Sequence, residues 1–315
     1  MKLRPVVKGL LTFIPGVDKI LPTRGTGGTN TAYYCYSVWI KHLTMLWKNG
    51  LRTVPNTVAE LGPGDSIGIG LAAMLSGVNR YFALDVVKYS NTDFNLKIFD
   101  ELVSLFESRA SRTHKGWPEI VQLLDENRFP SHILTDEWLQ KSLSKERISL
   151  IRNAIENPEF LDNDIAVTYM VPWSESDVIE KESVDVILSH SVLEHVADAE
   201  EVYKALSSWL KPEGLMSHQI DFSSHGTSAK WNGYRAYSEF LWKIILGKRE
   251  FLINRLPVSA HLNLMEKYGF DIFCLMKNYE PDGIERKELS SAWKSISDDD
   301  LACSGAFIQV RKPIP

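Results

Sequence analysis

The sequence predicts a doubly wound α/β protein, a fold in which helices cover both faces of a mostly parallel sheet. Apolar strands alternate with helical segments from residue 57 onward, and this alternation is typical of parallel strands joined by crossover helices. A glycine cluster at 62–70 follows the first strand and opens a helix. Two β-branched runs end the chain, and we expect them to pair antiparallel at the sheet edge.

The expected strands are short runs rich in β-branched and aromatic residues. They fall near 57–61, 81–86, 165–171, 183–189, 215–222, 270–277 and 303–311. A helix from about Asp198 to Leu210 should end at Lys211-Pro-Glu-Gly214, because proline and glycine both stop helices. The sequence therefore predicts a Rossmann-like, mostly parallel seven-stranded sheet with an antiparallel last strand.

Three segments do not follow this alternation of strands and helices. Residues 1–56 are expected to form a helical N-terminal prefix, and residues 57–315 the main domain. Within that domain, residues 87–164 are too long for one crossover and predict a helical insertion. Residues 223–260 are rich in aromatic side chains, and we expect this second insertion to shape a binding pocket at the end of the sheet.

Composition and charge narrow the class of protein. The chain has 315 residues with 35 basic and 40 acidic side chains, a formal charge of −5, so it carries no global positive field for nucleic acid. Its three cysteines are scattered, which argues against a disulfide framework and favours the reducing cytoplasm. No apolar run is long enough to span a membrane. The amphipathic N-terminus is expected to pack on the domain, with peripheral membrane contact as the less favoured alternative.

The glycine cluster predicts a nucleoside site. Gly62 and Gly64 lie where the first strand meets the first helix, and glycine there lets a ligand approach the backbone at a helix N-terminus. Asp85 follows the second strand, 21 residues after Gly64, where a carboxylate accepts hydrogen bonds from a ribose diol. The site thus predicts a nucleoside cofactor.

The identity of the cofactor depends on two departures from the dinucleotide pattern. Ile67 stands where the third glycine of G-x-G-x-x-G would be. Glu60 lies two residues before the first glycine, and its charge suits an ammonium or sulfonium better than a diphosphate. These features favour S-adenosylmethionine over NAD, which remains the alternative.

The motifs resemble those of class I methyltransferases. Their first motif is acidic-x-Gly-x-Gly-x-Gly, which Glu60, Gly62 and Gly64 match, whereas Ser66 replaces the last glycine. The segment 183–196 is similar to the fourth-strand motif of the methyltransferase type 11 group, and 209–214 to the turn before its fifth strand. The resemblance implies an S-adenosylmethionine-dependent methyltransferase, and some similar proteins are associated with surface-polysaccharide genes.

The resemblance also implies which residues contact the cofactor. Glu60, Gly62 and Gly64 would face the methionine portion and Asp85 the ribose. Trp173 occupies the turn after the third strand, where many relatives contact adenine, and stacking on the base and packing against the insertion remain open alternatives. His190 ends the fourth strand and would contact the cofactor through its main chain.

Candidates for the chemistry lie after strands four and five. We expect His225 to be the general base, with Asp221 orienting it or the acceptor. Glu194 and His195 are expected to stabilise a helix start. No metal is expected, because His218 and Asp221 should point to opposite faces of their strand.

The acceptor is expected to be a small molecule or glycan methylated on oxygen, or less favourably on nitrogen. Trp231, Asn254 and Arg255 are the candidate acceptor-binding residues, because aromatic faces with amide and guanidinium donors suit a sugar or an acid. Two alternatives remain: an NAD-dependent oxidoreductase, and a protein that binds S-adenosylmethionine without turnover.

Overall fold

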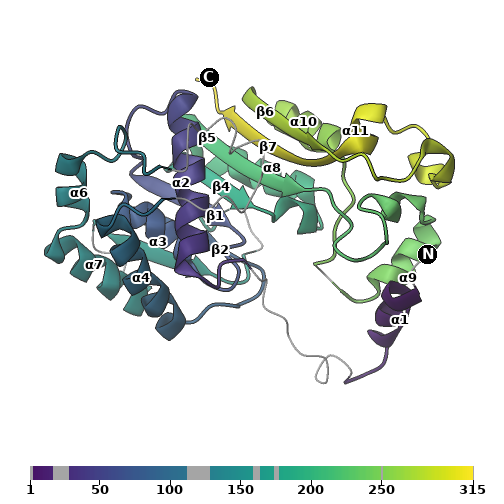
Figure 1. The fold of residues 1–315 in the computed structure, drawn as a ribbon, viewed down its shortest axis with the longest axis horizontal. Coiled ribbons are helices and arrows are strands. Elements are labelled where there is room, and N and C mark those ends of the chain that lie inside the picture. Colours follow the sequence, from purple (N-terminus) through teal and green to yellow (C-terminus); the bar gives the residue numbers. More distant parts are fainter. Residues whose placement is uncertain are drawn as a thin grey trace.

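The computed structural model describes residues 3–16, 28–111, 128–158, 164–173, 177–249 and 251–314. Seven strands form one sheet in the order β3-β2-β1-β4-β5-β7-β6 (Figure 1). They are β1 Thr57–Leu61, β2 Arg80–Leu84, β3 Ala166–Met170, β4 Val184–His190, β5 Leu210–Asp221, β6 Asp271–Tyr279 and β7 Cys303–Arg311. All neighbours are parallel except the pairs that β7 makes with β5 and β6. The predicted sheet is confirmed.

The strand order reverses between β1 and β4, so the carboxyl ends of these strands flank a switch point. Chain connections from neighbouring strands leave in opposite directions there, which opens a crevice where ligands bind in such sheets. The glycine turn and the residues after β2, β4 and β5 all lie along this edge. The fold therefore gathers the predicted site residues at one edge of the sheet.

Helices cover both faces. On one face, α2 Ala32–Lys48, α3 Gly68–Leu75 and α4 Thr92–Glu107 share a core with Val58, Tyr81 and Val186 of the strands. On the other, α8 Ala199–Trp209 and α10 Val258–Lys267 pack over Ala59 and Ile187. The doubly wound prediction is therefore correct, and α2, from the predicted prefix, forms part of the main core. The boundary at residue 56 remains a prediction.

The first insertion is helical, as predicted, in its described residues. It contributes α4 together with α6 Asp136–Ser142 and α7 Lys145–Glu156. Ser144 caps α7 by accepting a hydrogen bond from Arg147 N–H at 3.2 Å. Because α7 contacts α4 and β3, the insertion extends the layer on the α2 face.

The segment before the fifth strand differs from the prediction. Lys211-Pro-Glu-Gly214 was expected to be a turn, but β5 already begins at Leu210. The register between β4 and β5 shifts between Val184 and Val186, and such an irregularity admits a proline that cannot donate to the ladder. The helix still ends at Trp209, next to the predicted position.

The N-terminal helix α1 Leu3–Leu11 packs on α9 Glu239–Leu246 of the second insertion (Figure 1). The two backbones are so close that a Cβ on Gly9 would lie 1.9 Å from the Ile244 carbonyl oxygen. Lys248 N–H also donates to Thr12 Oγ1 at 2.9 Å. The expectation that this helix packs on the domain is met, although the side chains of Leu3, Val7 and Leu10 remain exposed.

No helix in the described ranges is both long and apolar enough to cross a membrane.

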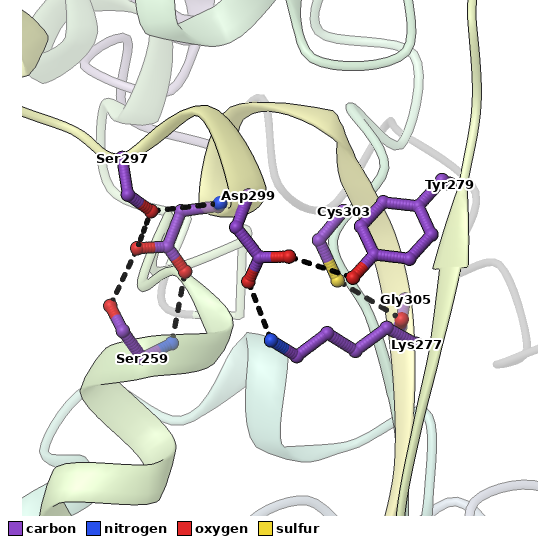
Figure 2. A network of polar contacts seen from close by, with 8 residues as sticks. Ser259, Lys277, Tyr279, Ser297, Asp299, Cys303 and Gly305 are labelled. Carbon is purple, nitrogen blue, oxygen red and sulfur yellow. Dashed lines mark hydrogen bonds and ion pairs between the residues drawn. The ribbon is translucent and has the colours of Figure 1, made fainter.

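Short helices complete the second half of the chain. They are η1 Leu193–His195, η2 Gly233–Ala236, η3 Arg286–Glu288, η4 Ser291–Trp293 and α11 Asp298–Ala302. Two acidic residues of α11 tie it to its neighbours (Figure 2). Asp300 accepts hydrogen bonds from Ser259 Oγ and N–H at 2.7 and 3.0 Å, and Asp299 accepts from Lys277 Nζ at 2.5 Å and from Tyr279 Oη at 2.7 Å. These contacts join α10 and β6 to the helix that leads into β7.

Candidate functional site

The glycine turn has the backbone that the sequence predicts. Gly62 and Gly64 adopt φ of +62° and +74°, a region that favours glycine. A Cβ on Gly62 would also lie 2.6 Å from the side chain of Val192. A larger residue would therefore strain the turn and crowd the start of η1.

Asp85 lies against this turn, as its spacing from Gly64 predicts. Its Oδ2 accepts a hydrogen bond from Gly64 N–H at 3.2 Å, and its Oδ1 accepts from Val86 N–H at 2.8 Å. Burial raises the pKa of Asp85, and these backbone donors oppose the rise. Each carboxylate oxygen can accept a further hydrogen bond, so the residue fits a ribose diol.

Glu60 is buried and hydrogen-bonded to a neighbouring strand. Its buried carboxylate accepts a hydrogen bond from Tyr81 Oη at 2.5 Å, on the face covered by α3. Burial raises the pKa of Glu60 to about 8, while hydrogen bonds from Tyr81 and from the Gly70 backbone oppose that rise. The carboxyl group therefore contacts the first turn of α3. Its contact with the methionine portion of the cofactor stays a prediction.

Ser66, which replaces the last glycine of the motif, anchors the segment before α2. Its Oγ donates to the Thr29 carbonyl oxygen at 2.5 Å, and its N–H donates to Thr29 Oγ1 at 3.1 Å. Thr29 Oγ1 in turn donates to the Pro63 carbonyl oxygen at 2.7 Å. Ser66 therefore connects the segment before α2 to the glycine turn through hydrogen bonds. Residues 24–27 of the glycine-rich segment before it lie outside the described residues.

His190 ends β4, as predicted, and faces α2. Its ring lies edge-on to Tyr34 with centroids 6.0 Å apart, and its Nδ1 lies 3.3 Å from His42 Nε2. Burial, aided by Lys41, lowers the pKa of His190 to about 3, so the ring is neutral. His42 bonds onward to Ser217 Oγ at 2.7 Å. Sequence reasoning missed His42, because nothing along the chain links α2 to these strands.

Trp173 is joined to Asp85 through the main chain. Its N–H donates to the Asp85 carbonyl oxygen at 3.1 Å. Its ring lies edge-on to Trp209, with centroids 5.3 Å apart, and packs in the core under α8. This contact is with α8 and not with the first insertion, and stacking on the adenine base stays a prediction.

Asp221 and His225 form the pair that the sequence predicts. His225 Nε2 lies 3.3 Å from Asp221 Oδ2, and Ser223 N–H donates to Asp221 Oδ1 at 2.8 Å. Burial tends to raise the pKa of Asp221, but the hydrogen bonds from His225 and Ser223 lower it overall. Asp221 is therefore ionised at neutral pH and orients the imidazole.

Glu194 and His195 are not the helix-start residues that we expected. Asp198 caps α8 instead, by accepting a hydrogen bond from Glu201 N–H at 3.1 Å. Glu194 is 2% exposed and lies in the wall of the cavity that contains Asp221, and the His195 ring lies edge-on to that of His225, with centroids 4.9 Å apart. The sequence feature that could have pointed to a functional role is an acid next to a histidine, directly after the carboxyl end of a strand.

The three predicted acceptor residues have different environments. Arg255 lines the cavity beside Asp221. Its Nη2 donates to both carboxylate oxygens of Glu239 at 3.0 and 2.8 Å, while Nε and Nη1 have no hydrogen-bond partner among the described residues. Trp231 does not line this cavity.

Asn254 has a structural role instead. Its Nδ2 donates to the carbonyl oxygens of Leu193 and Val196 at 2.8 and 2.9 Å, and its Oδ1 accepts from Leu256 N–H at 2.9 Å. Both amide protons hold the η1 segment, while Oδ1 can accept one further hydrogen bond and Asn254 lines the same cavity as Arg255. Its role in acceptor binding stays a prediction.

The strand order, the glycine turn and the acid after β2 define the class I methyltransferase fold, whose cofactor is S-adenosylmethionine. The family described as a methyltransferase domain matches residues 139–217, about a quarter of the chain. The protein is an S-adenosylmethionine-dependent methyltransferase. No curated protein sequence matches the chain.

Three solved structures illustrate the likeness in fold. A methyltransferase from Mesorhizobium loti has 13% identity and a TM-score of 0.42, with 86% of this chain and 97% of that chain covered. One from Methanosarcina mazei has 10% identity and a TM-score of 0.41, with 86% and 98% covered. Phosphoethanolamine N-methyltransferase 2 of Haemonchus contortus, solved with S-adenosylmethionine, has 14% identity and a TM-score of 0.42, with 90% and 57% covered. Similarities this distant have no bearing on the acceptor.

The raised pKa of Glu60 predicts a pH-dependent stability. Between pH 4.5 and about 8 the folded state keeps a proton on Glu60 that the unfolded state loses, so the free energy of unfolding falls as pH rises through this window. Glu60→Gln should remove that fall, which is at most roughly 1.4 kcal/mol per pH unit. Urea unfolding at pH 5.5, 6.5, 7.5 and 8.5 without cofactor measures it. The exposed Glu101→Gln is the control, and parallel pH curves for wild type and Glu60→Gln would refute the assignment.

Proposed function

We propose that the protein transfers a methyl group from S-adenosylmethionine to a hydroxyl of a small molecule or glycan that carries a negative group. The observation that carries this proposal is the contact between Asp221 and His225, whose Oδ2 and Nε2 atoms lie 3.3 Å apart, beside the cavity wall that includes Arg255. Asp221 is the last residue of β5 and His225 follows it, at the same sheet edge as the glycine turn. A base and a cationic donor thus meet next to the cofactor crevice.

The cofactor supplies an activated methyl group on a sulfonium. In the transfer, a bond forms between the acceptor oxygen and the methyl carbon while the sulfur–carbon bond breaks, and the sulfur keeps the electron pair as a neutral thioether. The acceptor loses its hydroxyl proton. Because the donor is already activated, the chain contributes mainly alignment and proton removal.

We assign proton removal to His225. Its Nε2 faces the carboxylate of Asp221, which fixes the orientation of the ring and stabilises the imidazolium that forms. The neutral rings of His190 and His195, whose pKa values burial lowers to about 3 and about 4, are poorer proton acceptors. His225 is therefore the better candidate of the three.

We assign recognition of the negative group to Arg255. Its Nε and Nη1 lack partners within the described part of the chain. The buried Arg235 stacks between Tyr234 and Trp293, with its Cζ 5.1 and 4.7 Å from their ring centroids, and its guanidinium nitrogens also lack hydrogen-bond partners there. Two arginines with one nearby carboxylate, Glu239, favour an acceptor with a carboxylate or phosphate group.

We further propose that the protein works in the cytoplasm. Cys35, Cys274 and Cys303 are all free thiols, and thiols persist in a reducing compartment. Membrane contact through α1, whose outer face exposes Leu3, Val7 and Leu10, is the less favoured alternative, and the surface-polysaccharide association remains a hypothesis about the acceptor.

The cofactor site is tested by parallel calorimetric titrations with S-adenosylhomocysteine and NAD. We expect micromolar binding of the first alone, and a loss of at least about tenfold in Asp85→Ala, because the ribose loses its carboxylate partner. Asp93→Ala, on an exposed position of α4, is the matched control and should bind normally. Binding of NAD alone, or equal affinity in Asp85→Ala and wild type, would contradict the proposal.

The base is tested by methyl transfer from labelled S-adenosylmethionine to a panel of acidic glycans and hydroxy acids. His225→Gln should lower kcat by roughly 100-fold or more while leaving the affinity for S-adenosylhomocysteine unchanged. His132→Gln, a change at an exposed histidine of the first insertion, should have no effect. Label transfer or slow hydrolysis that depends on no acceptor would instead favour a protein that binds the cofactor without turnover.

A further inference from the structure

Three side chains converge at the carboxyl ends of β4 and β5. Glu194, His195 and His225 each offer one ligand atom, and these atoms all lie within 4.8 Å of one another. Ligand atoms at roughly 2.1 Å from a shared ion lie roughly 3 to 4 Å apart. Small side-chain rotations would therefore bring the three atoms into one coordination sphere.

Glu194 is the group that most needs a partner. It is 2% exposed, and neither of its carboxylate oxygens has a hydrogen-bond partner in the described ranges. Burial raises the pKa of Glu194 well above its usual range, and the backbone N–H groups of Glu194 and Asp221 oppose that rise only in part. Protonation would remove the charge but leave an O–H donor and a carbonyl oxygen unsatisfied, whereas a cation would satisfy the charge and the oxygen lone pairs together.

In each of the two histidines one ring nitrogen has a polar partner and the other is available, which is the usual arrangement in a metal ligand. The backbone of Phe251 accepts a hydrogen bond from His195, and His195 Nδ1 is buried without a partner among the residues described. The Nε2 of His225 faces Asp221 at 3.3 Å, which leaves its other ring nitrogen available. A hydrogen bond on one ring nitrogen fixes the tautomer and directs the lone pair of the other toward an ion.

We propose that Glu194, His195 and His225 form a binding site for a divalent first-row transition ion. One carboxylate and two imidazoles suit ions such as Mn²⁺, Co²⁺ and Zn²⁺ better than Ca²⁺ or Mg²⁺, which prefer oxygen ligands. Three protein ligands leave coordination positions open. This set differs from His218, Asp221 and His225, the set considered from the sequence, and His218 hydrogen-bonds to Ser189 Oγ at 2.8 Å.

A role for the ion in catalysis rests on the proposed methyl transfer. An ion held by Glu194 would lie at the edge of the cavity that Glu194, Asp221 and Arg255 line, where its open coordination positions would be available to an acceptor hydroxyl. A bound hydroxyl would lose its proton at lower pH, because a divalent ion stabilises the alkoxide. His225 would then act as a ligand, and the proton would pass to solvent or to Asp221 rather than to His225.

The experiment is a calorimetric titration of metal-stripped full-length chain with Co²⁺ alone, followed by the visible spectrum of the complex. We expect one ion per chain with a micromolar Kd and d–d absorption that reports imidazole coordination. Glu194→Gln should weaken binding by at least about tenfold, whereas Glu200→Gln, at an exposed position on α8, should bind like the wild type.

His225→Gln is the second ligand variant, because His225 lies near the surface and its replacement is less prone to disturb folding than that of buried Glu194. It should show the same loss of affinity and a changed spectrum. A wild-type Kd above about 1 mM, or unchanged binding in His225→Gln, would overturn the proposal.

The two proposals fail independently. Binding of S-adenosylhomocysteine depends on the glycine turn and Asp85, and it is measured without Co²⁺. Normal binding of S-adenosylhomocysteine with no binding of Co²⁺ would refute the metal site alone. Binding of Co²⁺ without binding of S-adenosylhomocysteine would refute the cofactor assignment and leave the ion site standing.

Discussion

The hydrogen bond between Gly64 N–H and the Asp85 carboxylate, 3.2 Å long, joins the two segments on which the site depends. The left-handed backbone at Gly62 and Gly64 turns the N–H groups of the loop toward the end of β2. Tyr81 and the Gly70 backbone then fix Glu60 beneath the helix that follows. The glycine turn, Asp85 and the N-terminus of α3 are therefore one hydrogen-bonded unit. The strand order of the sheet opens a crevice next to this unit.

A second constraint is the burial of ionisable groups on both sides of that crevice. On the α2 face, His190 and His42 are neutral rings in a buried chain that continues to Ser217. After β4 and β5, the carboxylate oxygens of Glu194 and Nδ1 of His195 are buried without hydrogen-bond partners in the described residues, while Asp221 keeps its charge through hydrogen bonds. The α2 side of the crevice thus holds neutral imidazole rings, whereas the other side combines the ionised Asp221 with Glu194 and His195, whose pKa values burial shifts toward their neutral forms. Shifted pKa values of this kind cluster at functional sites.

The sheet could be predicted from the sequence because short β-branched runs and glycine-rich turns can be recognised from neighbouring residues alone. The start of β5 could not, because the register shift near Val184 that admits Pro212 depends on the neighbouring strand. The spacing of Asp85 from Gly64 placed both residues at one edge of the sheet, since successive strand ends in a parallel sheet meet there, and the structure brings them into contact. Contacts between remote segments left no such signal: Thr29 with Ser66, His42 with His190, and Asn254 with the η1 segment are created only by folding.

The grouping of Glu194 and His195 with His225 shows where residue-by-residue reasoning stops. From the sequence, Glu194 and His195 were expected to be structural residues and His225 a general base. Their chemistry emerges only when η1 and the loop after β5 are placed side by side. The same packing explains why Arg255, distant in sequence from η1 and from β5, lines a cavity together with Glu194 and Asp221.

The most direct test of the account is a crystal structure of the chain with S-adenosylhomocysteine. We expect the ribose hydroxyls on the Asp85 carboxylate, the homocysteine portion over Gly62 and Gly64, and the sulfur directed toward the cavity of Asp221 and His225. Electron density for the ligand elsewhere on the sheet, or a ribose that makes no contact with Asp85, would contradict the account.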